Sequence, residues 1–145
     1  MKALSVLLLF LFLFGAPSAF SAGIGSITKL EGQGWILRGE KEIPAFSGAR
    51  LFVQDSLKTG TNGAIGIILH DDTIISMGPE SEMELAEYLF QPDKNRFTML
   101  TKLFRGTFSY LSGVMGKLAP EKVKVQTPVG MVAIRGTHFL VKIEE

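Results

Sequence analysis

The 145-residue sequence contains no cysteine. Disulfide frameworks, thiol nucleophiles and cysteine-ligated metal sites are therefore excluded, and the fold must be held by its apolar core. The sequence also lacks a nucleotide-binding pattern, because its 16 glycines form neither a G-x-G-x-x-G motif nor a P-loop. Gly32-Gln33-Gly34 comes closest, but no helical pattern follows it, so no nucleotide cofactor is predicted.

Catalytic signatures are equally scarce. His138 could act as a base toward a Ser or Thr, but no G-x-S-x-G elbow accompanies it. His70 lies beside Asp71 and Asp72, and a divalent metal is the functional alternative there. Adjacent side chains on a strand point to opposite faces, however, and Asp-Asp is ordinary in turns. We therefore predict that the chain is not an enzyme and needs no metal or other cofactor.

Acidic side chains cluster in one stretch of the chain. Glu80, Glu82, Glu84 and Glu87 could supply the paired carboxylates of a glycoside hydrolase, but a solvated strand or helix face explains them better. Trp35 and the phenylalanines are expected in the core, because aromatic side chains dominate small β cores. A nucleic-acid site would need a basic face with exposed aromatics, so no nucleic acid partner is predicted.

Residues 1–21 have the layout of a secretory signal peptide. Lys2 precedes an apolar run over residues 4–14, which is shorter than the roughly 20 residues needed to cross a bilayer. Small residues then crowd a cleavage site after Ser21, or after Ala22. Cleavage would leave residues 22–145 as one domain without a membrane span, in the periplasm or secreted. A retained N-terminal anchor is the alternative.

Charge is divided unevenly along the chain. Residues 22–93 carry 5 basic and 11 acidic side chains, whereas residues 94–145 carry 9 basic and 3 acidic ones. The two parts therefore have net charges of −6 and +6. We expect them to pair across one sheet or sandwich, and a dipolar surface that steers assembly or docking is the alternative.

Short apolar segments alternate with turn signals about every 8–12 residues, a pattern typical of all-β domains. We predict short, mostly antiparallel strands in a sandwich or jelly-roll-like architecture, with a small β-solenoid as the alternative. Residues 81–90 fit a helix or a strand, and the alternation of Met83 and Leu85 with glutamates favours a strand of a hairpin. Residues 112–119, which include Gly113 and Gly116, are expected to form a loop.

Characteristic turn motifs are spread along the chain. Leu57-Lys58-Thr59-Gly60 and Gly78-Pro79 precede an Arg-Gly-Thr segment close to the C-terminus. With the strands between them, these segments resemble the FecR domain family over roughly residues 27–143. The residues of this chain that carry the family pattern are Thr59, Gly60, Gly78, Pro79, Gly106, Pro128, Gly130, Arg135, Gly136, Thr137 and Phe139.

The resemblance implies a stand-alone extracytoplasmic β domain that binds an unidentified envelope or secreted protein in sensing, signalling or assembly. Family members that act as anti-sigma regulators also carry a sigma-binding region and a membrane helix, which this chain is expected to lack. Arg135 is expected to lock a turn through its guanidinium donors. The alternative is a carbohydrate- or small-ligand-binding module, for which Trp35 or Tyr110 would have to face solvent in a groove.

Overall fold

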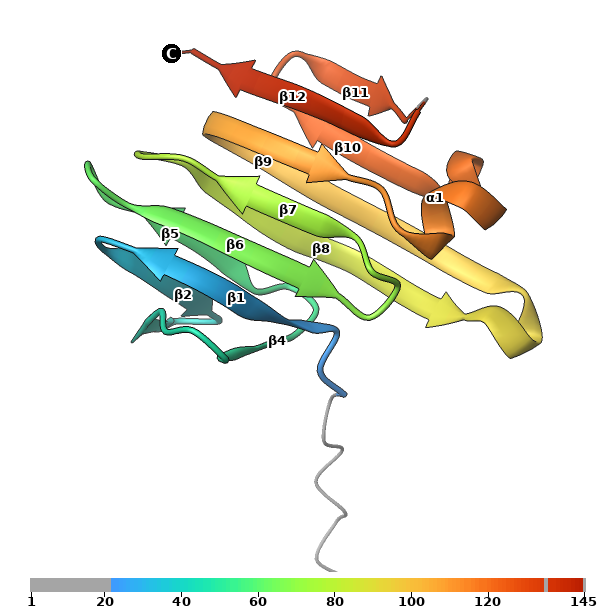
Figure 1. The fold of residues 1–145 in the computed structure, drawn as a ribbon, viewed down its shortest axis with the longest axis horizontal. Helices are drawn as coiled ribbons and strands as arrows, with labels where there is room; N and C mark the ends of the chain where they lie inside the picture. Colours follow the sequence, from blue (N-terminus) through green and yellow to red (C-terminus); the bar gives the residue numbers. More distant parts are fainter. Residues whose placement is uncertain (1–21, 135, 145) are drawn as a thin grey trace, which may run out of the picture.

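The computed structural model describes residues 22–134 and 136–144, and this part of the chain is built mostly from β-strands (Figure 1). The prediction of an all-β domain is therefore confirmed. Between the strands lie the short helix α1 (Val114–Leu118) and the 3₁₀ turns η1 (Pro92–Lys94) and η2 (Pro120–Lys122). The strands are β1 (Gly25–Glu31), β2 (Gly34–Arg38), β3 (Lys41–Pro44), β4 (Arg50–Leu51), β5 (Ser56–Thr59), β6 (Ala64–Leu69), β7 (Ile74–Met77), β8 (Glu82–Gln91), β9 (Arg96–Leu111), β10 (Val123–Thr127), β11 (Gly130–Ala133) and β12 (His138–Ile143).

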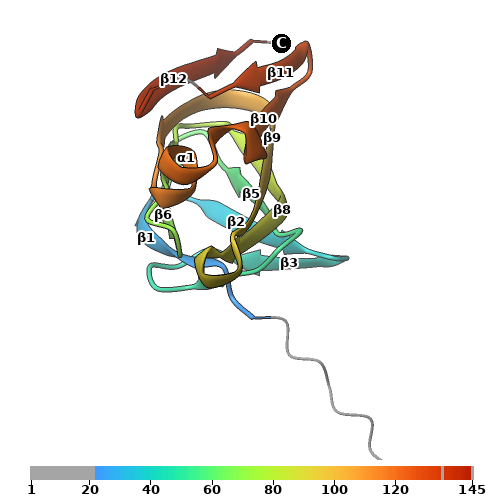
Figure 2. The same cartoon turned by 90° about the vertical axis from the view of Figure 1, so that its right-hand side faces the viewer.

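The strands lie in two layers that share β9. The first layer contains β4, β1, β6, β7, the C-terminal half of β9 and β12. The second layer contains β3, β2, β5, β8, the N-terminal half of β9, β10 and β11. Seen end-on, the sheet curls so that the layers face each other across the core (Figure 2). The described strand pairs are antiparallel except for β9 with β10, as the sequence predicted for most of them.

β9 can serve both layers because it is long and bent. Its N-terminal half pairs with β8 as far as Glu82, which lies opposite Arg105. Its C-terminal half pairs with β7, beginning with Met77 opposite Phe108. Residues 78–81 join β7 to β8 and face only the two residues of β9 that lie between these pairs. The β7–β8 connection is therefore longer than the part of β9 that it faces. This extra length allows β7 and β8, together with β9, to bend from one layer into the other.

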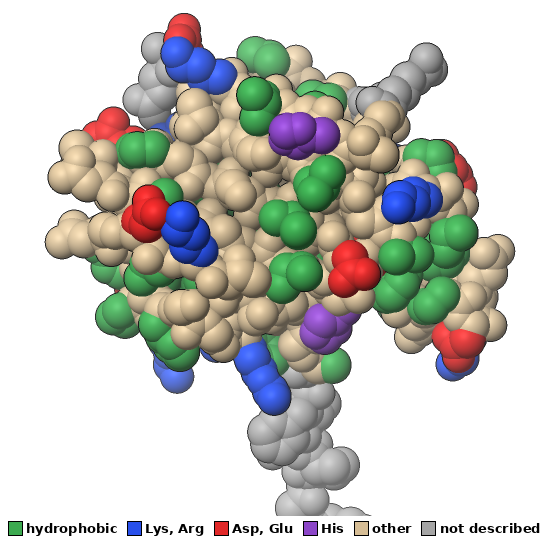
Figure 3. Space-filling model, viewed as in Figure 1, with side chains coloured by type: hydrophobic (Ala, Val, Ile, Leu, Met, Phe, Trp, Pro, Cys, Tyr) green, Lys and Arg blue, Asp and Glu red, His purple; other side chains and the backbone are tan. Residues whose placement is uncertain are grey.

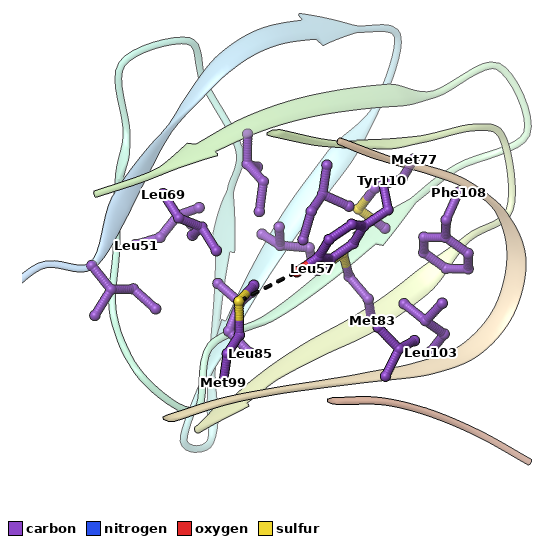
Figure 4. Packing of buried hydrophobic residues seen from close by; sticks show 14 of the residues in the cluster. Leu51, Leu57, Leu69, Met77, Met83, Leu85, Met99, Leu103, Phe108 and Tyr110 are labelled. Carbon is purple, nitrogen blue, oxygen red and sulfur yellow. Dashed lines mark hydrogen bonds between the residues drawn. The ribbon is translucent and has the colours of Figure 1, made fainter. Parts of the chain in front are cut away.

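The core lies between the layers and consists mainly of aliphatic and methionine side chains (Figure 4). Every second residue of β6 is buried, as expected for a strand with one face against a core. Tyr110 extends into the interior, where its hydroxyl donates a hydrogen bond to Met99 Sδ at 3.3 Å. The largest fully buried side chains are Ile27, Ile36, Leu51, Leu57, Ile65, Ile67, Leu69, Ile75, Met77, Met83, Met99 and Met115.

Two of the ambiguous segments have clear outcomes. Residues 81–90 fall in β8, so the prediction of a hairpin strand is confirmed. The prediction of a loop over residues 112–119 is wrong, because α1 lies within it. Gly113 and Gly116 do not prevent this short helix, since tertiary contacts at its first turn outweigh its weak propensity. Among the described residues, no helix is long and apolar enough to cross a membrane.

Asp71 supplies the contacts at the first turn of α1. Its side chain is buried and accepts hydrogen bonds from the Tyr88 hydroxyl at 3.0 Å, the Thr73 hydroxyl at 2.9 Å and the Met115 N–H at 3.2 Å. The Asp71 carbonyl also accepts from the Val114 N–H at 2.7 Å. Asp71 therefore lies in a turn, as predicted, but it also ties the β6–β7 turn to β8 and to α1.

Arg38 and Asp55 form a second, partly buried connection, between β2 and the residue before β5. The guanidinium Nε and Nη2 each donate to one carboxylate oxygen of Asp55 at 2.8 Å. Asp55 is 1% exposed and also accepts from the Phe52 N–H at 2.9 Å. The Arg38 guanidinium lies over the Phe52 ring, 4.6 Å from its centroid. Hydrogen bonding to Asp55 raises the pKa of Arg38, so this paired geometry favours the charged form.

We expect the two tyrosines of the chain, Tyr88 and Tyr110, to resist ionisation until the protein unfolds. Burial, together with the nearby Asp71, raises the pKa of both hydroxyls far above the usual value. The unfolded chain ionises its tyrosines near pH 10 and the folded chain does not, so stability should fall as the pH rises beyond about 10. Tyrosinate absorbance and circular dichroism should therefore change together. Tyrosinate formation near pH 10 with the dichroism signal intact would contradict this prediction.

Candidate functional site

Five of the residues that carry the family pattern meet where β9 passes between the layers. Thr59 and Gly60 come from the end of β5, Gly78 and Pro79 from the β7–β8 connection, and Gly106 from the middle of β9. Three segments that are distant in the sequence thus converge at one place. We call this junction of residues 59–60, 78–81 and 105–107 the corner.

Thr59 holds the corner together through its hydroxyl. This buried hydroxyl donates to the Gly78 carbonyl at 2.7 Å and accepts from the Ser81 N–H at 2.8 Å. The Thr59 N–H donates to the Ser81 carbonyl at 2.9 Å, and the Glu80 N–H donates to the Gly60 carbonyl at 3.0 Å. Buried backbone groups without partners cost free energy, so these bonds replace the strand-to-strand bonds that β7 and β8 lose at the bend.

Gly106 allows β9 to approach the β7–β8 connection closely. Its φ is +99°, in the region that side chains rarely adopt, and a Cβ at this position would overlap Ser81. The neighbouring Thr107 N–H donates to the Ser81 hydroxyl at 3.1 Å. Gly78 is constrained in a similar way, because a Cβ there would overlap the Thr107 hydroxyl. The two glycines therefore have a steric role in bringing β9 against the β7–β8 connection.

A groove of about 800 Å³ opens on the outer side of the corner. Trp35 forms part of its wall, and acidic and basic side chains line the rest. Such a lining can hold an extended segment that carries both charges better than it can hold an apolar ligand. The residues that line the groove are Gln33, Trp35, Glu42, Lys58, Thr59, Gly60, Thr61, Pro79, Glu80, Arg105, Gly106, Thr107, Lys142 and Ile143.

Charged residues of the two halves of the chain pair beside the corner. Glu82 lies opposite Arg105, with 3.7 Å between Glu82 Oε2 and Arg105 Nε. Glu84 lies opposite Lys102 on the same two strands. At these positions the acidic and basic halves meet within one molecule, as the sequence led us to expect. Glu82 and Glu84 therefore belong to a partly solvated, charge-paired face of the second layer.

The other residues of the family pattern lie away from the corner. Pro128 and Gly130 form the exposed turn between β10 and β11, where the Thr127 hydroxyl donates to the Gly130 carbonyl at 3.0 Å. The Thr137 carbonyl accepts from the Ser112 N–H at 2.7 Å. Phe139 stacks on Tyr110 with 4.8 Å between ring centroids, which fixes β12 against β9.

Arg135, which is predicted to lock a turn, lies outside the described residues. Its neighbour Gly136 has a φ of +99° and no atoms near its missing Cβ. The structure therefore brings five residues of the family pattern together at the corner and places Phe139 at the β9–β12 contact, whereas Pro128 and Gly130 lie apart on the β10–β11 turn.

The two histidines lie on different parts of the surface. His138 Nε2 is 3.0 Å from the Ser109 hydroxyl, but this pair is on an exposed strand face. His70 is exposed, whereas the neighbouring Asp71 points into the buried cluster with Tyr88. Within residues 22–134 and 136–144, no group of three histidine or acidic side chains is arranged to hold a metal ion.

The aromatic residues are divided between core and surface. Phe97 and Phe108 are buried, as predicted, and Tyr110 is buried as well. The expectation is wrong for Phe46 and Phe104, which are 58% and 43% exposed, because their strand or turn positions point them outward. Tyr110 is 3% exposed and cannot act as a stacking platform, whereas partly exposed Trp35 lines the groove.

Comparison with known proteins identifies one family. The model of the family described as FecR protein matches residues 55–145. The match begins later than residue 27, where the sequence motifs suggested that the resemblance starts, so β1 to β4 precede it. No curated protein and no solved structure matches the chain significantly.

We expect Gly106→Ala to destabilise the domain more than Gly136→Ala does. Both positions have a φ of +99°, so each alanine carries backbone strain of about 1–3 kcal/mol. Only the Gly106 variant also forces a Cβ onto Ser81, which should add ~1–3 kcal/mol. Urea unfolding of both variants measures the difference. Equal losses of stability would show that the close approach at the corner does not matter.

Proposed function

This chain belongs to the FecR family, a non-catalytic family of signalling and protein-interaction domains, and we propose that it is an exported module that binds another envelope protein through the corner groove. The position of this groove is the observation that supports the proposal. It lies on the corner that the family's Thr59, Gly60, Gly78, Pro79 and Gly106 build, and none of these residues presents a reactive group to it.

The lining of the groove supports a protein segment as its occupant. Glu42 and Glu80 contribute negative charge, and Lys58 and Lys142 contribute positive charge. A polypeptide can present both charges, as well as an apolar residue for the partly exposed Trp35. Arg105 and Glu82 already pair with each other, so the occupant does not have to neutralise them.

A carbohydrate or other small ligand is the second candidate, and Trp35 is the observation that favours it. An indole at the wall of a polar groove is a typical platform for a sugar ring. Trp35 is the single tryptophan of the chain, so its fluorescence reports directly on occupancy of the groove.

We expect a photo-crosslinking residue at Thr61 to capture a partner protein in intact cells of the source. Thr61 is exposed on the groove, whereas Gln126, the control position, is exposed on β10 and outside the groove. One protein captured from Thr61 and absent from Gln126 supports the proposal. If the folded protein yields no adduct from Thr61, and soluble glycans change Trp35 emission, the small-ligand function replaces it.

We also expect the protein recovered from cells to begin at Ala22 or Gly23. This follows from the predicted cleavage after Ser21 or Ala22, and export supplies the compartment that the proposed function needs. Intact-mass measurement of the protein in the periplasmic and extracellular fractions tests it. Recovery of the full 145-residue chain in the membrane fraction would instead indicate a retained anchor.

A further inference from the structure

The outer face of the first layer differs from the rest of the surface because its middle strands carry no charge. The outward side chains of β6, β7 and β9 on this face are Ala, Gly, Ile, Ser, Thr and Leu. Blue side chains lie mostly toward the margins of this face, and a red side chain lies to the right of its centre, beside hydrophobic ones (Figure 3). By contrast, the outer face of the second layer carries the Glu82–Arg105 pair and Glu84 opposite Lys102.

Strand register places the outward residues of this face in three rows. Each row crosses the layer from β1 through β6, β7 and β9 to β12. The first row is Ser26, Ile68, Ile74, Leu111 and His138. The second row is Lys29, Gly66, Ser76, Ser109 and Leu140. The third row begins with Glu31 and Ala64 and ends with Thr107 and Lys142, with Gly78 between them.

The face has features of a binding surface. Leu140 is 76% exposed, and Ile74 and Leu111 are 39% and 41% exposed. Beside Leu140, the small residues Ser76 and Ser109 leave a mainly apolar hollow of about 480 Å³. Exposed apolar side chains grouped on one face of a protein commonly mark a protein interaction site. No Phe, Tyr or Trp occurs in the three rows, so the face lacks a large aromatic platform for stacking sugars or bases.

We propose that this face binds the same face of a second copy of the chain, around a two-fold axis that runs along β7. Such an axis places β6 over the partner's β9 and β1 over the partner's β12. Each row then faces the same row of the other copy. Ser76 then lies on the axis. Because the middle strands carry no charge, closing this interface leaves no charged group buried without a partner.

Charge at the ends of the third row supports this pairing. Glu31 lies at the β1 end and Lys142 at the β12 end, so the two-fold axis brings each Glu31 to the Lys142 of the other copy. Both side chains are well exposed in one copy, where Lys29 and Glu144 pair with them at 2.9 and 2.8 Å. Exposed pairs of this kind exchange partners at little cost.

The size of the face predicts a weak dimer. Strands about 4.8 Å apart and rows about 6.8 Å apart give a footprint of roughly 500 Å² for each copy. The total of about 1,000 Å² is at the lower end for a specific interface. We therefore expect association to depend on concentration. Self-association through this face is independent of binding in the corner groove, because the face and the groove are built from largely different residues.

Sedimentation of the purified protein at concentrations up to about 1 mM tests self-association. We expect Ser76→Arg to weaken it by at least about tenfold, because two added charges meet at the axis. Gln126→Arg adds the same charge to the exposed outer face of the second layer and should leave association unchanged. A protein that remains monomeric throughout this range overturns the proposal.

Two further sets of variants test the geometry of the dimer. Since the chain has no cysteine, Ser76→Cys and Gln126→Cys each provide one thiol for a short bis-maleimide linker. Dimers linked through position 76 and not through position 126 support the axis along β7, and equal linking at both positions overturns it. Lys142→Glu should weaken the dimer and Glu31→Lys should restore it in the same chain. Failure of this rescue overturns the proposed pairing of β1 with β12.

Discussion

The bend of β9 is the constraint on which the rest of the domain depends. β9 hydrogen-bonds to β7, β8, β10 and β12, and the remaining strands reach it through these neighbours. One strand can belong to two layers only if its backbone turns sharply, and Gly106 against Ser81 provides that turn. The Thr59 hydroxyl satisfies the backbone groups exposed by the turn. In a chain without disulfides, these local bonds define the angle at which the layers enclose the core.

The sequence predicted features that depend on local pattern. Alternation of apolar and acidic residues identified β8, and glycine with proline located the turns at Gly78 and Pro128. It could not show that residues 97–111 belong to one continuous strand, because the bend at Gly106 looks like a strand break in one dimension. The roles of Ser81 and Asp71 were missed for a related reason. Both are ordinary turn residues by type, and only the folded chain shows that they are buried and bonded to distant segments.

The two outer faces of the domain differ in charge. On the second layer, acidic residues of β8 lie beside basic residues of β9, which keeps the face hydrated and its charges balanced. On the first layer, the outward residues of β6, β7 and the C-terminal half of β9 are uncharged, and the flanking strands carry Lys29, Glu31 and Lys142. The corner groove lies between these environments and contains both kinds of side chain.

The Arg38–Asp55 pair shows that the folding unit is larger than the segment that matches the family. Asp55 is the first residue matched by the family, yet its partner lies on β2, which precedes the match. A protein shortened to begin at residue 55 would leave Asp55 buried without its counter-charge. It would also expose the hydrogen-bonding edges of β5 and β6, which β2 and β1 cover. Bare strand edges of this kind recruit strands from other chains, so such a fragment would aggregate rather than fold.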